Sequence, residues 1–334
     1  MIEKEIKMKK FIIMLFLLIL GIIGNGTMAE SGQSSEGTYS VSPISSEHQT
    51  KGIEDFYDVR WTPSFTEHFG VFITNHTDKS QIYQLQVNKA HTNKNGIIDY
   101  SESKGESKTT SYCLTRMIQL PKEVTVPAGQ TQKVEGTLIF PQNEFNGILM
   151  AGIHISEKKS YSTSSTVSNI VSYNLPFVVR GNIDVRPQAK LELDKVNLDS
   201  FSSTQSSLDV QLSNKKATFL KESNFQAEIK NKKGEVIIKQ SSKIDITPET
   251  QFKYPVKLPL NLTAGEYQLI LNVKHAKDHW EFKQTFHISK EEIKTIHERT
   301  GIKDYSWIIY CIILFILFIG LLLIKLNCKW NKYK

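Results

Sequence analysis

The chain has 334 residues, of which 40% are hydrophobic and 22% charged, so it is long enough for two domains with cores of their own. Its 41 basic and 34 acidic residues give a formal net charge of +7, but eight of the lysines lie in the first and last ten residues. Without those lysines and the two N-terminal glutamates, 33 basic and 32 acidic residues remain. A near-neutral central region with no basic patch argues against nucleic acid as a partner.

The cysteines exclude a scaffold held together by internal disulfides. Cys311 lies in an apolar run and Cys328 in the basic tail, which leaves Cys113 alone in the rest of the chain. One thiol cannot form an internal disulfide, so hydrophobic cores must hold the fold. Cys113 is expected to be a small half-buried residue, and an intermolecular disulfide is the alternative role.

Residues 1–29 have the pattern of a secretory signal peptide. Lysines precede an apolar run at 11–23, and Thr27-Met28-Ala29 forms a small-x-small cleavage site. The pattern predicts cleavage near Ala29–Glu30 and export of the residues that follow.

Residues 38–185 are predicted to form a first β-sandwich. Tyr83, Leu85 and Val87 alternate with polar residues, which is typical of a half-buried strand. Turn signals such as Gly129 recur every 8–12 residues without a helical period. Runs rich in β-branched and aromatic residues are expected as strands at 56–61, 68–74, 81–89, 124–126, 131–140, 148–156 and 170–179.

Residues 186–290 are predicted to form a second sandwich, of the immunoglobulin-like type. The turn Asn231-Lys-Lys-Gly234 should connect the two strands of a hairpin. Tyr267 follows a glycine turn at the start of a strand, as the tyrosine corner of immunoglobulin-like domains does. The predicted fold class is therefore all-β, with two immunoglobulin-like β-sandwich domains that meet near Arg186.

The C-terminal residues predict a membrane anchor. Residues 291–305 read as a short polar stalk, helical where Ser289 can cap it. Residues 306–324 are apolar without a charge, and about 18 residues of helix span ~27 Å, close to the hydrocarbon core of a bilayer. Lysines without acidic residues follow in the tail at 325–334. By the positive-inside rule this tail is cytoplasmic, and the ectodomain lies outside at the cell surface, on a single-pass membrane protein.

One segment resembles a calcium-binding loop. With His91 as position 1, the oxygen-bearing and glycine positions 3, 5, 6, 9 and 12 fall on Asn93, Asn95, Gly96, Asp99 and Glu102. However, position 1 should be a carboxylate, and the preceding residues form a strand rather than a helix. A β-hairpin turned by Asn95-Gly96 explains the glycine equally well and is the preferred interpretation; calcium binding by the Asn93, Asn95 and Asp99 turn stays open.

No other pattern predicts a catalytic, cofactor or metal site. His275 and His279 are four residues apart, but on a hairpin they do not converge as they would on a helix. Trp61, Tyr57 and Phe65 could stack on sugar rings, although alternating aromatics more often form a sandwich core. The chain carries no H-E-x-x-H or G-x-S-x-G motif, so it is predicted not to be an enzyme.

Several stretches, in this order and spacing, resemble the WxL-interacting proteins of Gram-positive bacteria. The resemblance covers nearly the whole chain, although no single stretch is decisive. The matching stretches of the first domain are Tyr39-Ser-Val-Ser-Pro43, the segments 91–100 and 120–129, and Phe145-Asn-Gly-Ile-Leu-Met-Ala-Gly-Ile153. Those of the second domain are Leu262-Thr-Ala-Gly-Glu-Tyr-Gln-Leu269 and Trp280-Glu-Phe-Lys-Gln-Thr-Phe286. Cys113 stands where the family pattern has an ordinary polar or apolar residue.

The resemblance implies a membrane-anchored binding scaffold at the cell surface. The first domain is expected to attach to peptidoglycan and the second to host proteins, such as those of the extracellular matrix, in an adhesive role. WxL-domain surface proteins are the other expected partners. The family supplies no catalytic or ligand-contact residues. The alternative function is a cell-wall hydrolase or peptidase with a non-standard active site, which would require a constellation of residues that the sequence does not reveal.

Overall fold

The computed structural model describes residues 37–102, 112–158, 171–182, 185, 187–202, 205–259 and 262–299. The chain divides into residues 1–38 and a compact unit that starts at Tyr39 and holds every element named below. Within the described ranges, no helix is both long and apolar enough to cross a membrane. The predicted signal peptide, membrane helix and cytoplasmic tail, at 1–29, 306–324 and 325–334, lie outside these ranges.

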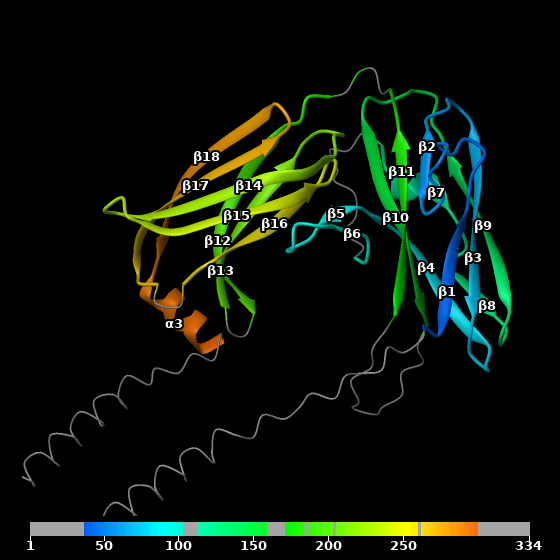
Figure 1. Cartoon of the computed structure of the whole chain (residues 1–334), viewed down its shortest axis with the longest axis horizontal. Coiled ribbons are helices and arrows are strands. Elements are labelled where there is room, and N and C mark those ends of the chain that lie inside the picture. The colour runs from blue at the N-terminus through cyan, green and yellow to red at the C-terminus, as the bar shows by residue number, and fades with distance from the viewer. Residues whose placement is uncertain are drawn as a thin grey trace, which may run out of the picture. The chain divides into compact units, whose positions relative to one another are not determined.

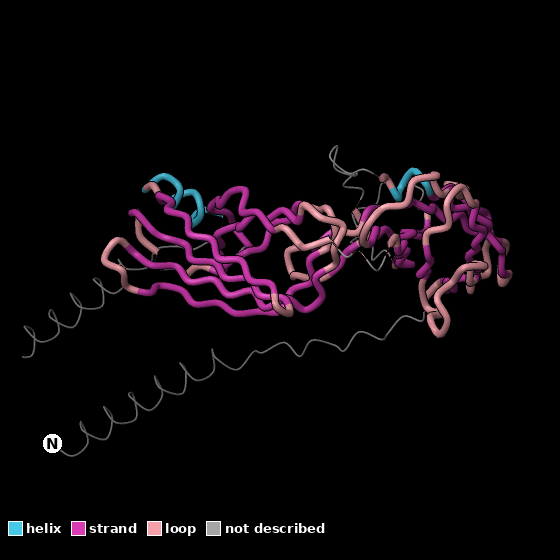
Figure 2. Tube along the Cα trace, turned by 90° about the horizontal axis from the view of Figure 1, so that it is seen from above, coloured by secondary structure: helices cyan, strands magenta, loops and turns pink. Residues whose placement is uncertain are grey.

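Strands dominate the described residues, with two short helices among them (Figures 1 and 2). This confirms that the chain is mostly β. The elements of the first half are β1 (Tyr39–Ile44), β2 (Tyr57–Arg60), β3 (Thr66–Asn75), β4 (Gln81–Lys89), β5 (His91–Thr92), β6 (Ile98–Asp99), α2 (Leu114–Met117), β7 (Ile118–Gln119), β8 (Glu123–Val126), β9 (Thr131–Ile139), β10 (Ile148–Glu157) and β11 (Ser172–Arg180).

The first sandwich pairs a four-stranded sheet with a five-stranded one. The strand orders are β1-β3-β9-β7 and β2-β11-β10-β4-β8. β8 pairs with β4 and β9 pairs with β3, so the turn at Gly129 carries the chain from one sheet to the other. Gly129 has φ +63°, a left-handed backbone that glycine adopts without strain. The predicted strand–turn–strand at this place is therefore a corner between sheets.

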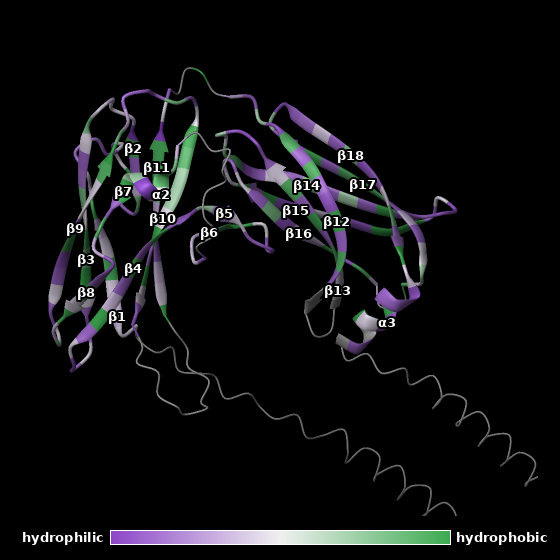
Figure 3. Cartoon of the chain, turned by 180° about the vertical axis from the view of Figure 1, so that it is seen from behind, coloured by the Kyte–Doolittle hydropathy of each residue, from purple (hydrophilic) through white to green (hydrophobic). Residues whose placement is uncertain are grey.

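An aromatic core fills the space between these two sheets. Tyr83 and Leu85 are buried, as their alternation predicts, and Val87 packs against the same core while half-buried. Tyr57 stacks on Phe177, with ring centroids 4.8 Å apart. Figure 3 shows hydrophobic stretches on β10 and β11, two inner strands of the five-stranded sheet. Ring stacking of this kind stabilises a core beyond the area that it buries.

The outer face of the five-stranded sheet is partly covered by the chain itself. A small cluster of buried residues, separate from the aromatic core, contains Tyr100, Met150 and Val178. A Cβ atom added to Gly152 of β10 would lie 2.6 Å from the ring of Tyr100, so the ring lies directly on the glycine backbone. This part of the sheet is consequently closed to solvent.

The second half of the chain forms another sandwich with a separate core. A three-stranded sheet, in the order β12-β13-β16, faces a four-stranded sheet, in the order β15-β14-β17-β18. The elements are β12 (Leu191–Ser202), β13 (Gln205–Asn214), β14 (Leu220–Asn231), β15 (Val236–Ile246), β16 (Gln251–Lys257), β17 (Gly265–His275), β18 (Asp278–Ile288) and α3 (Lys290–Arg299). All pairings within these two sheets are antiparallel.

Two local predictions for this sandwich are confirmed. β14 and β15 form the expected hairpin, and the amide of Gly234 donates to the carbonyl of Asn231 at 2.9 Å. The hydroxyl of Tyr267 donates to the carbonyl of Thr263 at 2.8 Å, which is the hydrogen bond of a tyrosine corner. Sequence alone was sufficient here because both features depend on residues close together in the chain.

The start of the predicted stalk is a helix that packs on the second sandwich. The Ser289 hydroxyl accepts from the Glu292 amide, and the Glu292 carboxylate accepts from the Ser289 amide, which together form a capping box. Hydrogen bonds from Ser289 lower the pKa of the Glu292 carboxyl group. Ile293 contacts the second core and Ile296 is buried, so this turn of the helix serves as more than a spacer. The domain boundaries themselves stay predictions.

The buried tyrosines of the first sandwich predict a loss of stability at high pH. Burial raises the pKa of Tyr83 from 10.0 to about 12 and also raises the pKa values of Tyr39, Tyr57 and Tyr100. Because the unfolded chain ionises first, the stability present below about pH 10 should fall as the pH rises through about 12. The tyrosinate absorbance of these four residues and the circular dichroism of the protein should change together. Ionisation of these four tyrosines near pH 10 with the fold intact would contradict this prediction.

Candidate functional site

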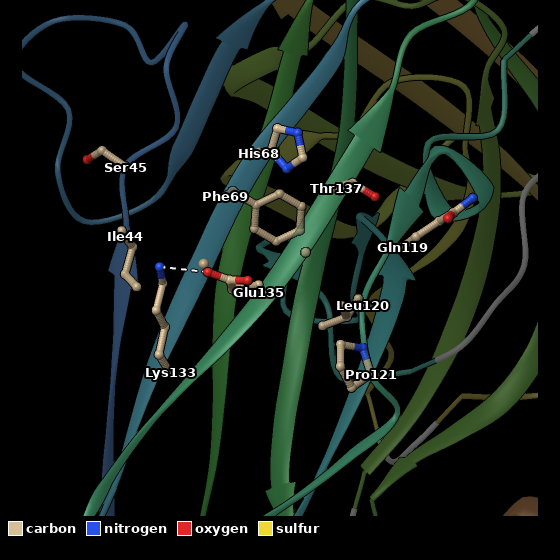
Figure 4. Close-up of a pocket in the computed structure, with 12 residues that line it drawn as sticks. Ile44, Ser45, His68, Phe69, Gln119, Leu120, Pro121, Lys133, Glu135 and Thr137 are labelled. Atoms are coloured by element: carbon tan, nitrogen blue, oxygen red, sulfur yellow. Dashed lines mark ion pairs between the residues drawn. The ribbon is translucent and has the colours of Figure 1, made fainter.

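An open groove lies on the outer face of the four-stranded sheet of the first sandwich (Figure 4). Cross-strand neighbours line its floor because inward residues such as Phe69 alternate with outward ones on β3. One row joins His68, Thr137 and Gln119 across three strands. The groove is lined by residues from Ile44 to Thr137, which lie 93 positions apart in the sequence.

A glycine and a proline-containing segment give the groove its depth. Gly70 leaves the centre of the floor low, and the side chain of Ile44 lies beside it, with Cδ1 2.9 Å from where a Cβ would be. Leu120 and Pro121, which follow β7, form an apolar wall. The volume of the groove is about 770 Å³. This lies within the ~300–1,000 Å³ typical of small-molecule and cofactor sites.

The charges in the groove pair with each other. The ammonium group of Lys133 lies 2.8 Å from the carboxylate of Glu135, and both side chains are exposed. The hydrogen bond from Lys133 lowers the pKa of the Glu135 carboxyl group. The opposite formal charges of this ion pair cancel. The site offers hydrogen-bonding side chains and apolar surface, and its lining carries no net excess of formal charge.

Another glycine, Gly136 on β9, faces the core beneath the floor of the groove. Gly136 pairs with Phe69, and a Cβ at Gly136 would lie 2.4 Å from the Phe69 ring. The ring lies against the glycine backbone and contacts the rings of Tyr57 and Phe177 in the core. Any larger residue at 136 would displace the ring and the strand above it.

The loop with calcium-like spacing is the predicted hairpin. β5 and β6 pair, and Gly96 at the turn has φ +75°. The Asn93 side-chain oxygen accepts from the amides of Asn95 and Ile97, so it holds the turn itself. The Asp99 side chain accepts from the Ser101 amide at 2.8 Å. Among the described residues, no three His, Cys, Asp or Glu side chains gather as metal ligands.

A further role of this hairpin was not evident from the sequence. The Asp245 amide of β15 donates to the Gly96 carbonyl at 2.8 Å, and the Thr92 hydroxyl donates to the Asp245 carbonyl at 2.7 Å. A Cβ at Gly96 would lie 2.4 Å from Ile244. The glycine thus permits both a tight turn and close approach to β15, and only the first of these has a local sequence signal.

The other candidate residues have structural roles. Trp61 and Tyr57 belong to the buried core, and Phe65 packs against it while half-buried, as the preferred interpretation predicts. Cys113 is half-buried and stands at the N-cap position of α2. Trp61 lies against Phe145, with ring centroids 5.2 Å apart. These aromatic residues therefore do not form a sugar-stacking surface.

The two closely spaced histidines contact different groups. His279 lies 3.0 Å from the side-chain oxygen of Asn272, and His275 lies 3.4 Å from the Ser223 hydroxyl. That serine is fully buried, and its hydroxyl donates to the Leu220 carbonyl. A buried hydroxyl already committed to a carbonyl is not placed as a nucleophile.

Comparison with known proteins identifies the family. Residues 39–157 match the model for the WxL Interacting Protein, peptidoglycan binding domain, and residues 162–298 match that for the WxL Interacting Protein, host binding domain. No curated protein matches the chain.

Similar solved structures share little sequence with the chain. The Class 5 fimbriae chaperone CfaA is 11% identical over 75% of this chain and 99% of that chain, with a TM-score of 0.28. The E. coli chaperone DraB is 13% identical over 74% and 96%, with a TM-score of 0.28. The PapD-like domain 7 of human CEP192 is 10% identical over 50% and 99%, with a TM-score of 0.26. Scores this low support no inference about function. The two domain matches together span residues 39–298, and the chain therefore belongs to the WxL-interacting protein family.

Proposed function

We propose that the protein is a scaffold of the bacterial cell surface that attaches to peptidoglycan through its first sandwich and does not cleave it. The observation that carries the proposal is the groove on the four-stranded sheet, because its lining residues all fall within residues 39–157, the range that matches the peptidoglycan-binding domain. The charged side chains of the groove, Lys133 and Glu135, pair with each other, and hydrogen-bonding groups lie beside an apolar wall. Such a lining suits the uncharged, hydroxyl-rich sugar rings of this polymer.

The second sandwich is proposed to engage proteins. Its match to the host binding domain supports host proteins, including those of the extracellular matrix, as partners. The family name supports association with WxL-domain surface proteins. The predicted signal peptide and the apolar segment at 306–324 complete the proposal by placing both sandwiches outside a single-pass anchor.

Sedimentation with purified peptidoglycan tests the proposal. Full-length protein in detergent should pellet with cell-wall sacculi that have been stripped of other polymers, and no soluble muropeptide should appear during long incubation. The near-neutral central region predicts only modest weakening between about 0.05 and about 0.5 M salt, because screened surface charges contribute little. Protein that stays in the supernatant would overturn peptidoglycan attachment, whereas released muropeptides would favour the hydrolase alternative.

A further inference from the structure

We infer that the groove takes the glycan strand of peptidoglycan, a polymer of N-acetylated hexosamines, and that Phe72 is the ring on which one sugar stacks. The inference rests on the proposed function, since it names the part of the polymer that the first sandwich contacts. No sequence motif singled out Phe72, which reads as one more aromatic residue in an alternating strand.

The first argument is that the outer face of the four-stranded sheet is open, whereas the outer face of the five-stranded sheet is partly covered. On the five-stranded sheet, Met150 and Val178 point outward yet are buried beneath the segment that contains Tyr100. On the four-stranded sheet, the outward residues of β3 and β9 include Phe72 at 41% and Ile139 at 43% relative exposure. The described part of the chain leaves this face accessible to a ligand.

The second argument is the position of the exposed ring. Phe72 is two residues beyond Gly70 on β3, so its side chain points to the same face as the groove. It pairs with Ser42 on one side and with Lys133, a lining residue, on the other. From His68 to Phe72 the strand advances about 13 Å. The surface is thus an elongated strip along the strand, which matches a linear polymer better than a compact ligand.

The third argument is the chemistry of the strip. A pyranose ring has an apolar C–H face and hydroxyl groups around its edge, so it needs a flat ring beneath it and hydrogen-bonding groups beside it. Phe72 supplies the former, while His68 and Thr137 can supply the latter. Leu120 and Pro121 can contact the methyl group of an acetamide. Stem peptides carry charged ends, and the ion pair between Lys133 and Glu135 leaves no net charge to hold them.

Binding of full-length variants to sacculi tests this assignment. We expect Phe72→Ala to weaken binding about tenfold, and His68→Ala by a smaller factor, because each removes one contact of several. The matched control is Ile82→Ala on β4, which removes a side chain of similar exposure, 39%, from the other sheet. The control should bind within about twofold of wild type. Circular dichroism should show all three variants folded.

Competition separates the glycan from the stem peptide. Soluble chitin oligosaccharides, which are uncharged chains of N-acetylated hexosamines without peptide, should displace the wild-type protein from sacculi, and the isolated stem peptides should not. The glycan assignment is wrong if the wild-type protein pellets and both Phe72→Ala and His68→Ala bind as well as the wild type. It is also wrong if stem peptides compete instead. In either case peptidoglycan attachment stands. If the wild-type protein does not pellet at all, the proposed function itself fails.

Discussion

Replacing Arg180 by methionine should lower the free energy of unfolding of the first sandwich by about 3 kcal/mol. Arg180 binds Asp58 through two hydrogen bonds, with Nε–Oδ1 at 2.7 Å and Nη2–Oδ2 at 2.6 Å. The Asp58 side chain has no exposed surface, whereas that of Arg180 is 35% exposed. Removing the guanidinium therefore leaves a buried carboxylate with its other hydrogen bond, from the Thr50 hydroxyl, as partial compensation.

The matched control is Lys158→Met. Lys158 also makes two contacts with a carboxylate, at 2.8 and 2.9 Å from the oxygens of Glu123, but both side chains are over 40% exposed. Water can solvate Glu123 once the lysine is gone, so the loss of stability should be much smaller than that of Arg180→Met. Urea unfolding of the two variants provides the comparison. Equal losses would mean that burial of Asp58 does not determine the energy of its ion pair.

Features that depend on residues close together in sequence could be predicted. The alternation around Tyr83 identified a strand and its buried face, and the positions of Gly234 and Tyr267 identified a hairpin and a tyrosine corner. The strand shows itself by its own alternation, and the hydrogen bonds of the turn and the corner join residues three and four positions apart. Local backbone preferences and side-chain periodicity are therefore sufficient to establish them.

Features that depend on strand register could not be predicted. The groove brings Ile44, Gly70 and Glu135 into one row, and nothing in the sequence near any of them indicates the pairing. His68 and Glu135 read as ordinary surface residues of alternating strands. Strand register is set by the whole sheet, so the site becomes visible only once β1, β3, β7 and β9 are aligned.

Gly96 illustrates how a local explanation can be correct and incomplete. A hairpin turn accounts for the glycine, because the left-handed backbone there favours it. The same residue also allows the hairpin to approach Ile244, which is far away in the sequence. A substitution there would be strained for two reasons, and the turn alone would account for only one of them.

Replacing Phe225 by alanine should destabilise the second sandwich by about 3–5 kcal/mol, because a fully buried ring leaves a cavity that the surroundings only partly fill. Phe225 has no exposed surface and contacts the ring of Tyr254, with centroids 4.7 Å apart. The two large cores consist of different residues. We therefore expect calorimetry to show two transitions, of which only the one belonging to the second sandwich shifts to lower temperature.

Phe72→Ala is the control for this last prediction, since it removes the same side chain from an exposed position on the first sandwich. Its effect on either transition should be below about 1 kcal/mol.

If Phe225→Ala lowers both transitions together, the hairpin contacts through Gly96 and Asp245 couple the sandwiches into one cooperative unit, and the predicted division near Arg186 is wrong. If only the transition of the second sandwich shifts, the first sandwich of the Phe225→Ala variant should still bind peptidoglycan. The peptidoglycan sedimentation assay at a temperature between the two transitions would then show whether the groove functions independently of the second sandwich.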